Sequence, residues 1–210
     1  MSRESQSMIG MKPSLFGRLR ALCRLAVEDG GMAAVEFSLI LPLLVVLWIG
    51  GVEVTQALSV DRRLNNLASA IGDLAARSKQ LTYSDVDNIF DIAPGAMFPY
   101  CQTSTECQTA GLQMRVTAVD VDSGGNAKVA WSRAEGVSPY GAGDDLNTTV
   151  PPTLRVPDSQ IIMAEVNFTY TPAIGYVITG DLDLDDLMFF VPRLTQYVKL
   201  CDNDGNNCVS

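Results

Sequence analysis

A long apolar run dominates the early part of the chain. Between Gly30 and Val52 the only charged residue is Glu36, and no charge follows it up to Val52. A helix over this run is about 34 Å long at about 1.5 Å per residue, which suffices to cross a hydrocarbon core of about 30 Å. The pattern therefore predicts a transmembrane helix over residues 32–53, behind a leader at residues 1–31.

A helical period continues beyond the apolar run. Apolar residues recur three or four positions apart on one face, while charged and amide side chains occupy the other face. These apolar positions are Val60, Leu64, Leu67, Ile71 and Leu74. One helix from about Met32 to about Arg77 is predicted, with an amphipathic extension over residues 54–80. Packing of this stripe on the chain's own domain and a coiled-coil seam with a partner both explain it.

Shorter elements are predicted in the remaining domain, residues 81–210. Thr82 or Ser84 can cap a short helix from Ser84 to Ala93, which Pro94-Gly95 would end. Alternation of apolar and polar positions indicates several strands, joined by turns and loops rich in Gly and Pro. The strands are expected at residues 112–122, 127–133, 161–170 and 193–200, a turn at 123–126 and a long surface loop at 136–159. The predicted fold class is α+β, with the long N-terminal transmembrane and amphipathic helix packed on a small antiparallel sheet.

Charge is distributed unevenly along the chain, whose formal net charge is −9. Basic residues outnumber acidic ones in residues 1–29, whereas nineteen acidic residues stand against ten basic ones from Val54 onward. The positive-inside rule therefore places the leader in the cytoplasm and exports the distal domain of a single-pass membrane protein. The acidic excess in that domain argues against nucleic-acid binding, which requires Lys and Arg to neutralise phosphates.

A cleaved signal peptide is the competing explanation of the apolar run, because the small residues Ala57 and Ser59 loosely suit a cleavage site. The run is longer, however, than the about 7 to 15 apolar residues of a typical signal peptide. Glu36 also stands at its front, and the helical pattern passes through the would-be cleavage site without a break. These features favour a membrane anchor that stays attached.

Candidate catalytic and metal-binding residues are few. The sequence has no histidine, which excludes Ser-His-Asp triads, Cys-His pairs and histidine metal sites. No nucleophile has a base beside it, so neither catalytic residues nor a cofactor is predicted, and the chain is not expected to be an enzyme. The segment 202–206 resembles the opening of a calcium loop and the segment 181–186 is acidic, but neither has the distal Glu of an EF-hand. No metal site is assigned, and calcium binding by the exported domain is kept as a minor alternative.

Four of the five cysteines form two close pairs, Cys101 with Cys107 and Cys201 with Cys208. Both pairs lie in the predicted exported domain, whereas Cys23 lies in the leader. Disulfides form in oxidising compartments outside the cytoplasm, so this partition favours two disulfides. A zinc site built by the four thiolates and free buried thiols remain as alternatives.

The residues around Glu36 carry a motif, Gly-Gly-Met-Ala-Ala-Val-Glu-Phe-Ser-Leu-Ile-Leu-Pro, between Gly30 and Pro42. A glycine, four residues, a glutamate and an aromatic ahead of a long apolar helix form the pattern read by prepilin peptidases. The stretch resembles the TadE/TadG-like proteins of tight-adherence (Flp-type) pilus systems. The matching elements are Gly31, Ala34, Val35, Glu36, Phe37, Pro42, Gly51 and Glu53, with a similar post-membrane helix that includes Leu64, Leu67, Ala68 and the closing Ala75-Ala76-Arg77.

This resemblance implies a minor pilin-like or pseudopilin component of a pilus assembly or secretion apparatus, with a pilin-like fold. It implies as partners the bacterial inner membrane, the major pilin, the assembly platform proteins and a prepilin peptidase, and it places the exported domain in the periplasm. The peptidase would cut after Gly31, leaving the new amino group of Met32 four residues from Glu36 on one helix face. Glu36 and Phe37 are then the pilin-like motif, and Glu53 is a carboxylate at the membrane exit. An unprocessed, membrane-tethered adhesion or binding module with an acidic exported domain is the alternative.

Overall fold

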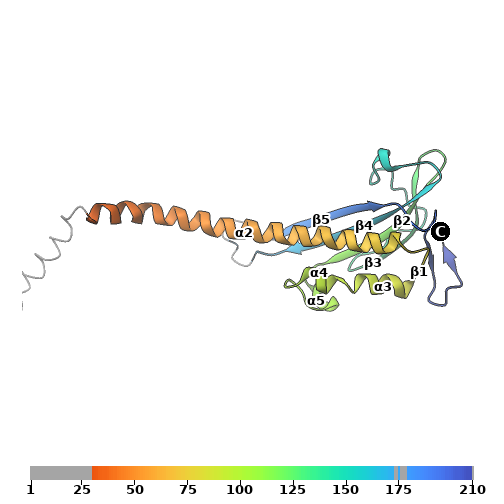
Figure 1. Cartoon of the computed structure of the whole chain (residues 1–210), viewed down its shortest axis with the longest axis horizontal. Coiled ribbons are helices and arrows are strands. Elements are labelled where there is room, and N and C mark those ends of the chain that lie inside the picture. The colour runs from red at the N-terminus through yellow and green to blue at the C-terminus, as the bar shows by residue number, and fades with distance from the viewer. Residues whose placement is uncertain (1–29, 173–174, 176–178, 210) are drawn as a thin grey trace, which may run out of the picture. The chain divides into compact units, whose positions relative to one another are not determined.

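One long helix connects the two compact units of the chain. The structure, a computed structural model, describes residues 30–172, 175 and 179–209 (Figure 1). The units are Met1–Gly51 and Val52–Ser210, and helix α2, Gly30–Ala76, contributes residues to both. The predicted helix over 32–77 is thus confirmed, whereas Cys23 and almost all of the predicted leader lie outside the described residues.

The part of α2 in the first unit is covered with exposed apolar side chains. Every residue from Met32 to Trp48 is exposed, whereas a core helix of a soluble protein would bury such a run. The segment is long and apolar enough to cross a membrane once. Pro42 lies inside the helix without ending it, as transmembrane helices tolerate.

The second unit is an α+β domain with two sheets, which confirms the predicted fold class. A four-stranded antiparallel sheet has the order β3-β2-β4-β5, and a three-stranded sheet has the order β1-β6-β7 with β1 and β6 parallel. After α2 the elements are β1 Gln80–Thr82, α3 Tyr83–Phe90, α4 Ala93–Met97, α5 Ser104–Thr109, β2 Gln113–Val121, β3 Ala127–Glu135, a 3-10 turn Pro152–Leu154, β4 Ser159–Tyr170, β5 Leu182–Phe190, β6 Lys199–Cys201 and β7 Cys208–Val209.

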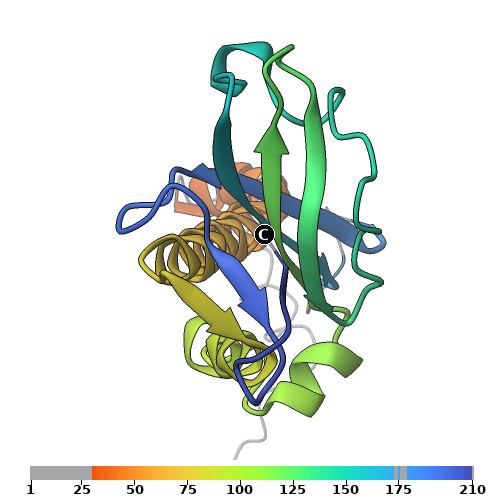
Figure 2. The same cartoon turned by 90° about the vertical axis from the view of Figure 1, so that its right-hand side faces the viewer.

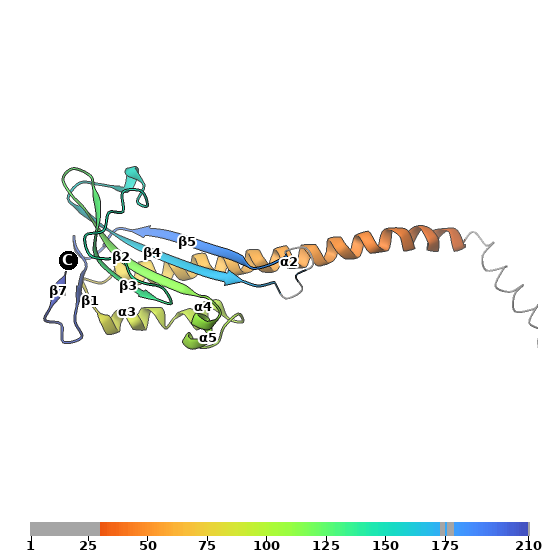
Figure 3. The same cartoon turned by 180° about the vertical axis from the view of Figure 1, so that it is seen from behind.

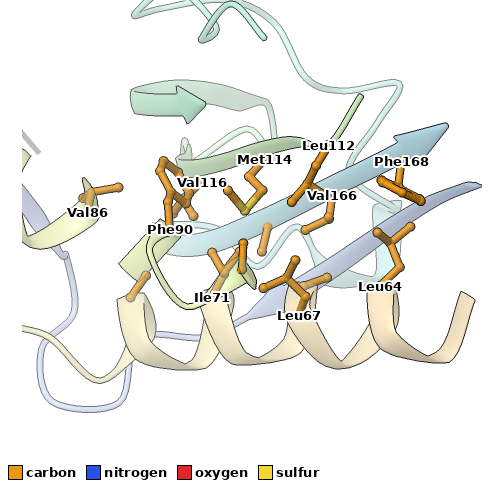
Figure 4. Close-up of a cluster of buried hydrophobic side chains, with 14 of the residues drawn as sticks. Leu64, Leu67, Ile71, Val86, Phe90, Leu112, Met114, Val116, Val166 and Phe168 are labelled. Atoms are coloured by element: carbon orange, nitrogen blue, oxygen red, sulfur yellow. The ribbon is translucent and has the colours of Figure 1, made fainter. Parts of the chain in front are cut away.

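The apolar stripe of α2 packs on the four-stranded sheet. Leu64, Leu67 and Ile71 are fully buried and point toward residues of β2 and β4, among them Met114 and Val166 (Figure 4). The stripe is therefore the core face of the chain's own domain rather than an exposed coiled-coil seam. Burial of this face supplies most of the hydrophobic stabilisation that holds α2 on the sheet.

The stripe differs from the prediction at its end. Leu74 is 41% exposed, while Ala68, Ala75 and Ala76 are fully buried. The predicted positions repeat every 3.5 residues on average, whereas a straight helix turns once in 3.6 residues, so the buried face drifts by about 20° per heptad. Small residues consequently replace leucine where the helix comes closest to the sheet.

The opposite face of the sheet is covered by the segment 136–158. Leu146 and Val150 of this segment are buried against a second apolar cluster that includes Val119 and Ile161. Figure 2 shows the segment running beside the strands on the side away from α2. The segment predicted as a long surface loop therefore covers this face of the sheet. Leu146 and Val150 were the apolar residues from which this packing could have been predicted.

The helix predicted over 84–93 is present as α3, which ends at Phe90, and a separate helix, α4, begins at Ala93. Thr82 caps α3 by accepting a hydrogen bond from the backbone N–H of Asp85, whose carboxylate in turn accepts from Thr82. Pro94 then lies in the first turn of α4 instead of ending the preceding helix. Proline is tolerated there because the first N–H groups of a helix have no intrahelical acceptor.

The strand predicted over 193–200 is wrong in most of its length. Only Lys199–Cys201 is extended and paired, as β6. Before it, the backbone N–H of Arg193 donates to the carbonyl of Ala76 at 2.9 Å, and that of Val198 donates to the side chain of Gln160 at 2.6 Å. These bonds take up backbone groups that a strand would need for its ladder.

A close approach of α2 to β5 depends on the absence of a side chain at Gly72. A Cβ atom there would overlap Cε2 of Phe190 and would lie 3.1 Å from Cβ of Ala164. We predict that Gly72→Ala lowers the free energy of unfolding by about 1–2 kcal/mol, because overpacking outweighs the better helix propensity of alanine. Urea unfolding of the full chain in detergent measures the change.

Gly95→Ala is the matched control for Gly72→Ala. Gly95 also lies in a helix, but a Cβ atom there would meet nothing within 4 Å. The control is expected to leave stability unchanged or slightly increased. Equal effects of the two substitutions would contradict the tight contact at Gly72.

Candidate functional site

The motif residues of the first unit lie on the exposed surface of α2. Met32 and Glu36 stand one helical turn apart, and both are exposed, as is Phe37. Glu36 is therefore a carboxylate on an otherwise apolar helix surface. A charged side chain in such a segment is costly in lipid, so it usually marks a contact with a partner charge.

Glu53, the carboxylate predicted at the membrane exit, is buried in the second unit with only 1% of its surface exposed. One turn further along α2, the Oε1 atom of Gln56 accepts a hydrogen bond of 3.3 Å from the hydroxyl of Tyr170, the last residue of β4. The ring of Tyr170 meets that of Tyr100 edge to face, with 5.9 Å between centroids. We call these four residues, Glu53, Gln56, Tyr100 and Tyr170, the Glu53 cluster.

The Glu53 cluster joins three segments that are distant in the sequence. It connects α2, the end of β4 and the segment that leads to Cys101. Burial raises the pKa of Tyr170, and the neighbouring Tyr100 and the Glu53 carboxylate raise it further. The sequence predicted Glu53 but not its companions, because only the fold brings Tyr100 and Tyr170 to it.

Both cysteine pairs are joined as disulfides. Cys101–Cys107 ties the segment beside Tyr100 to α5, and Cys201–Cys208 closes the turn between β6 and β7. The sulfurs are thereby unavailable to a metal, so the zinc alternative is wrong for this state of the protein. Within the described residues, no group of three or more His, Cys, Asp or Glu side chains could hold a metal ion.

The candidate calcium residues serve the local structure instead. The Asp202 carboxylate accepts hydrogen bonds from the backbone N–H of Asn206 at 2.9 Å and from the side chain of Asn207 at 2.6 Å. These bonds lower the pKa of Asp202 and hold the turn between β6 and β7. Asp181 and Asp183 accept from the hydroxyls of Thr171 and Thr169 at 2.7 Å and 2.9 Å. The two acidic segments therefore do not converge on one point.

A hollow of about 350 Å³ opens on the outer face of the sheet. Arg115 and Glu165 form an ion pair of 2.9 Å at its wall, and the guanidinium of Arg115 stacks over Tyr140 at 4.1 Å. Asp185 and Asp186 of β5 line the side toward the sheet edge. This hollow could not be predicted from the sequence, because its residues come from three strands and a loop.

The raised pKa of Tyr170 has a consequence at alkaline pH. The folded state holds the phenol proton above the ordinary pKa of 10.0, so the unfolded chain ionises first and stability falls as pH rises beyond that value. We predict that Tyr170→Phe makes the free energy of unfolding less dependent on pH above about 10. Denaturant unfolding at a series of pH values measures this, with Tyr83→Phe, at an exposed tyrosine of α3, as the control. Identical slopes for both variants would contradict the prediction.

Most of helix α2 matches a known protein family. Residues 31–72 match the family described as TadE-like protein, so the match begins at Gly31 and covers Glu36 and Glu53. Comparison with curated proteins and with solved structures finds no match. The match to the TadE-like family over residues 31–72 confirms the resemblance predicted from the motif around Glu36.

Proposed function

We propose that the chain is a minor pilin-like, or pseudopilin, component of a tight-adherence pilus assembly or secretion apparatus. The observation that carries the proposal is the TadE-like segment 31–72, in which Glu36 is exposed on an apolar helix. In this proposal α2 anchors the protein in the bacterial inner membrane, with residues 1–31 in the cytoplasm and residues 81–210 in the periplasm. The two disulfides support export, because such bonds persist in oxidising compartments.

In this proposal the membrane helix makes the contacts with other subunits. Its side chains from Met32 to Trp48 are exposed, so they are available to pack on the helices of major pilins or of assembly platform proteins. Glu36 offers such a bundle one charge, whose attraction to a cation is strong where the dielectric constant is low. A pairing of this kind would fix the axial register between neighbouring helices.

Processing by a prepilin peptidase would supply the partner cation. Hydrolysis of the bond after Gly31 creates an ammonium group on Met32, which lies four residues before Glu36 on the same face. That ammonium can pair with the Glu36 of its own chain or with that of a neighbour.

The processing step predicts the N-terminus of the mature protein. Protein extracted from membranes of the native host is expected to begin at Met32, and Gly31→Leu is expected to leave the chain uncut, because a bulky residue would obstruct the peptidase. Intact-mass spectrometry measures both. A mature chain that begins at residue 1 or 2 would contradict processing, while the role in pilus assembly would be tested separately.

The role in pilus assembly predicts a phenotype for Glu36. Deletion of the gene is expected to abolish surface pili, and a copy carrying Glu36→Gln, which removes the charge at constant shape, is expected not to restore them. Glu135→Gln, in an exported strand, is the matched control and is expected to restore them. Electron microscopy and pilin immunoblots measure the result. Normal pili together with lost surface attachment would instead support the adhesion module.

A further inference from the structure

The two edges of the four-stranded sheet differ in their cover. At the β3 edge, the backbone N–H of Leu146 donates to Ala127 at 2.9 Å, and that of Val129 donates to Asp144 at 3.0 Å. At the β5 edge, no backbone hydrogen bond other than those with β4 is present among residues 30–172, 175 and 179–209. One edge is thus closed by the loop, and the other is open.

The open edge is long and regular. β5 has nine residues, contains neither proline nor glycine, and keeps one register with β4 from Ile162↔Phe190 to Tyr170↔Leu182. Every second residue of an antiparallel edge strand turns its N–H and C=O groups away from the sheet. None of the nine residues is buried, whereas most of β4 is. Such an edge is a template for one more strand.

Charge selects among the strands that could pair there. Asp183, Asp185 and Asp186 lie in the first part of β5, and neither the Asp185 nor the Asp186 carboxylate forms a hydrogen bond or an ion pair with another described residue. A second copy added antiparallel to β5 and centred on it would place Asp186 opposite Asp186, and like charges directly opposite each other are destabilising. The acidic residues therefore oppose self-pairing and favour a basic segment.

The hollow beside the edge adds a place for a side chain. Asp185, Asp186 and Asn167 line it together with the paired Arg115 and Glu165. Because Glu165 neutralises Arg115, the carboxylate of Asp185, which lies on the same face of the sheet as this pair, leaves the hollow with a net negative charge. The side chain of Asp186, the next residue of β5, points to the other face. A long cationic side chain suits both its volume and its charge.

We propose that β5 is a docking edge for an extended, basic segment of a partner protein. The segment adds to the sheet as a fifth strand, its backbone pairs with β5, and a Lys or Arg side chain enters the hollow beside Asp185. The backbone bonds supply affinity and the hollow supplies specificity. This docking edge does not depend on the proposed role in pilus assembly, because an adhesion module could use it equally.

Peptide binding to the full chain in detergent micelles tests the docking edge. The probe is a fluorescent peptide as long as β5, nine residues, that alternates lysine with valine. One comparison peptide replaces lysine with glutamate, and another keeps lysine but carries N-methyl groups on alternate backbone nitrogens. Fluorescence anisotropy measures the affinities, and hydrogen exchange measures the protection of the β5 amides.

The lysine peptide is expected to bind saturably and to protect the β5 amides, while both comparison peptides bind weakly. Asp185→Lys is expected to weaken binding about tenfold, whereas the exposed control Asp61→Lys on α2 changes it less than about twofold. Absence of binding by the lysine peptide would overturn the proposal. Equal binding of the methylated peptide would overturn strand addition, and equal binding of the glutamate peptide would overturn charge selection. A dimer with protected β5 amides in the absence of peptide would identify a second copy as the occupant.

Discussion

The packing of one amphipathic helix on one sheet is the interaction on which the α+β domain depends. The four-stranded sheet of this domain has an apolar cluster on each face, and both faces must be covered from water. The stripe of α2 covers one face through Leu64, Leu67 and Ile71, with α3 and α4 beside it. Figure 3 shows this layer from behind, with β4 and β5 along α2 and the short helices next to them. Everything else in the domain completes this layer or covers the opposite face.

Small residues set the distance between these layers. Ala68, Gly72 and Ala75 lie where α2 comes closest to the sheet, and the ring of Phe190 occupies the space that a side chain at Gly72 would take. The helix is thereby held against the strand whose outer edge is open.

The sequence predicted the elements whose signal is long or regular. The helix of α2 repeats its period over many turns, and β2 and β4 are long strands bounded by turns, so their positions were correct to within a few residues. β5 was missed because its aspartates read as an acidic cluster, although Leu182 and Leu184 alternate with Asp183 and Asp185. The segment 193–198 was misread because long-range bonds to Ala76 and Gln160 decide its course.

The residues of the candidate site also fall into those that could be predicted from the sequence and those that could not. The motif around Glu36 is contiguous in the sequence and could be recognised there, as could the two cysteine pairs. The Glu53 cluster could not, because the hydrogen bond between Gln56 and Tyr170 joins positions 114 residues apart. The same holds for the hollow, whose charged wall forms only when β2, β4 and β5 lie side by side.

The small sheet also constrains the order in which the chain can fold. β1 follows directly after α2, yet its only strand partner within the described residues is β6, which pairs Gln80 with Lys199 and Thr82 with Cys201. A protein leaves the ribosome in sequence order, so β1 cannot pair with β6 until almost the whole chain has been made. Closure of this sheet is therefore a late step of folding, and a truncation that removes β6 would leave β1 without its strand partner.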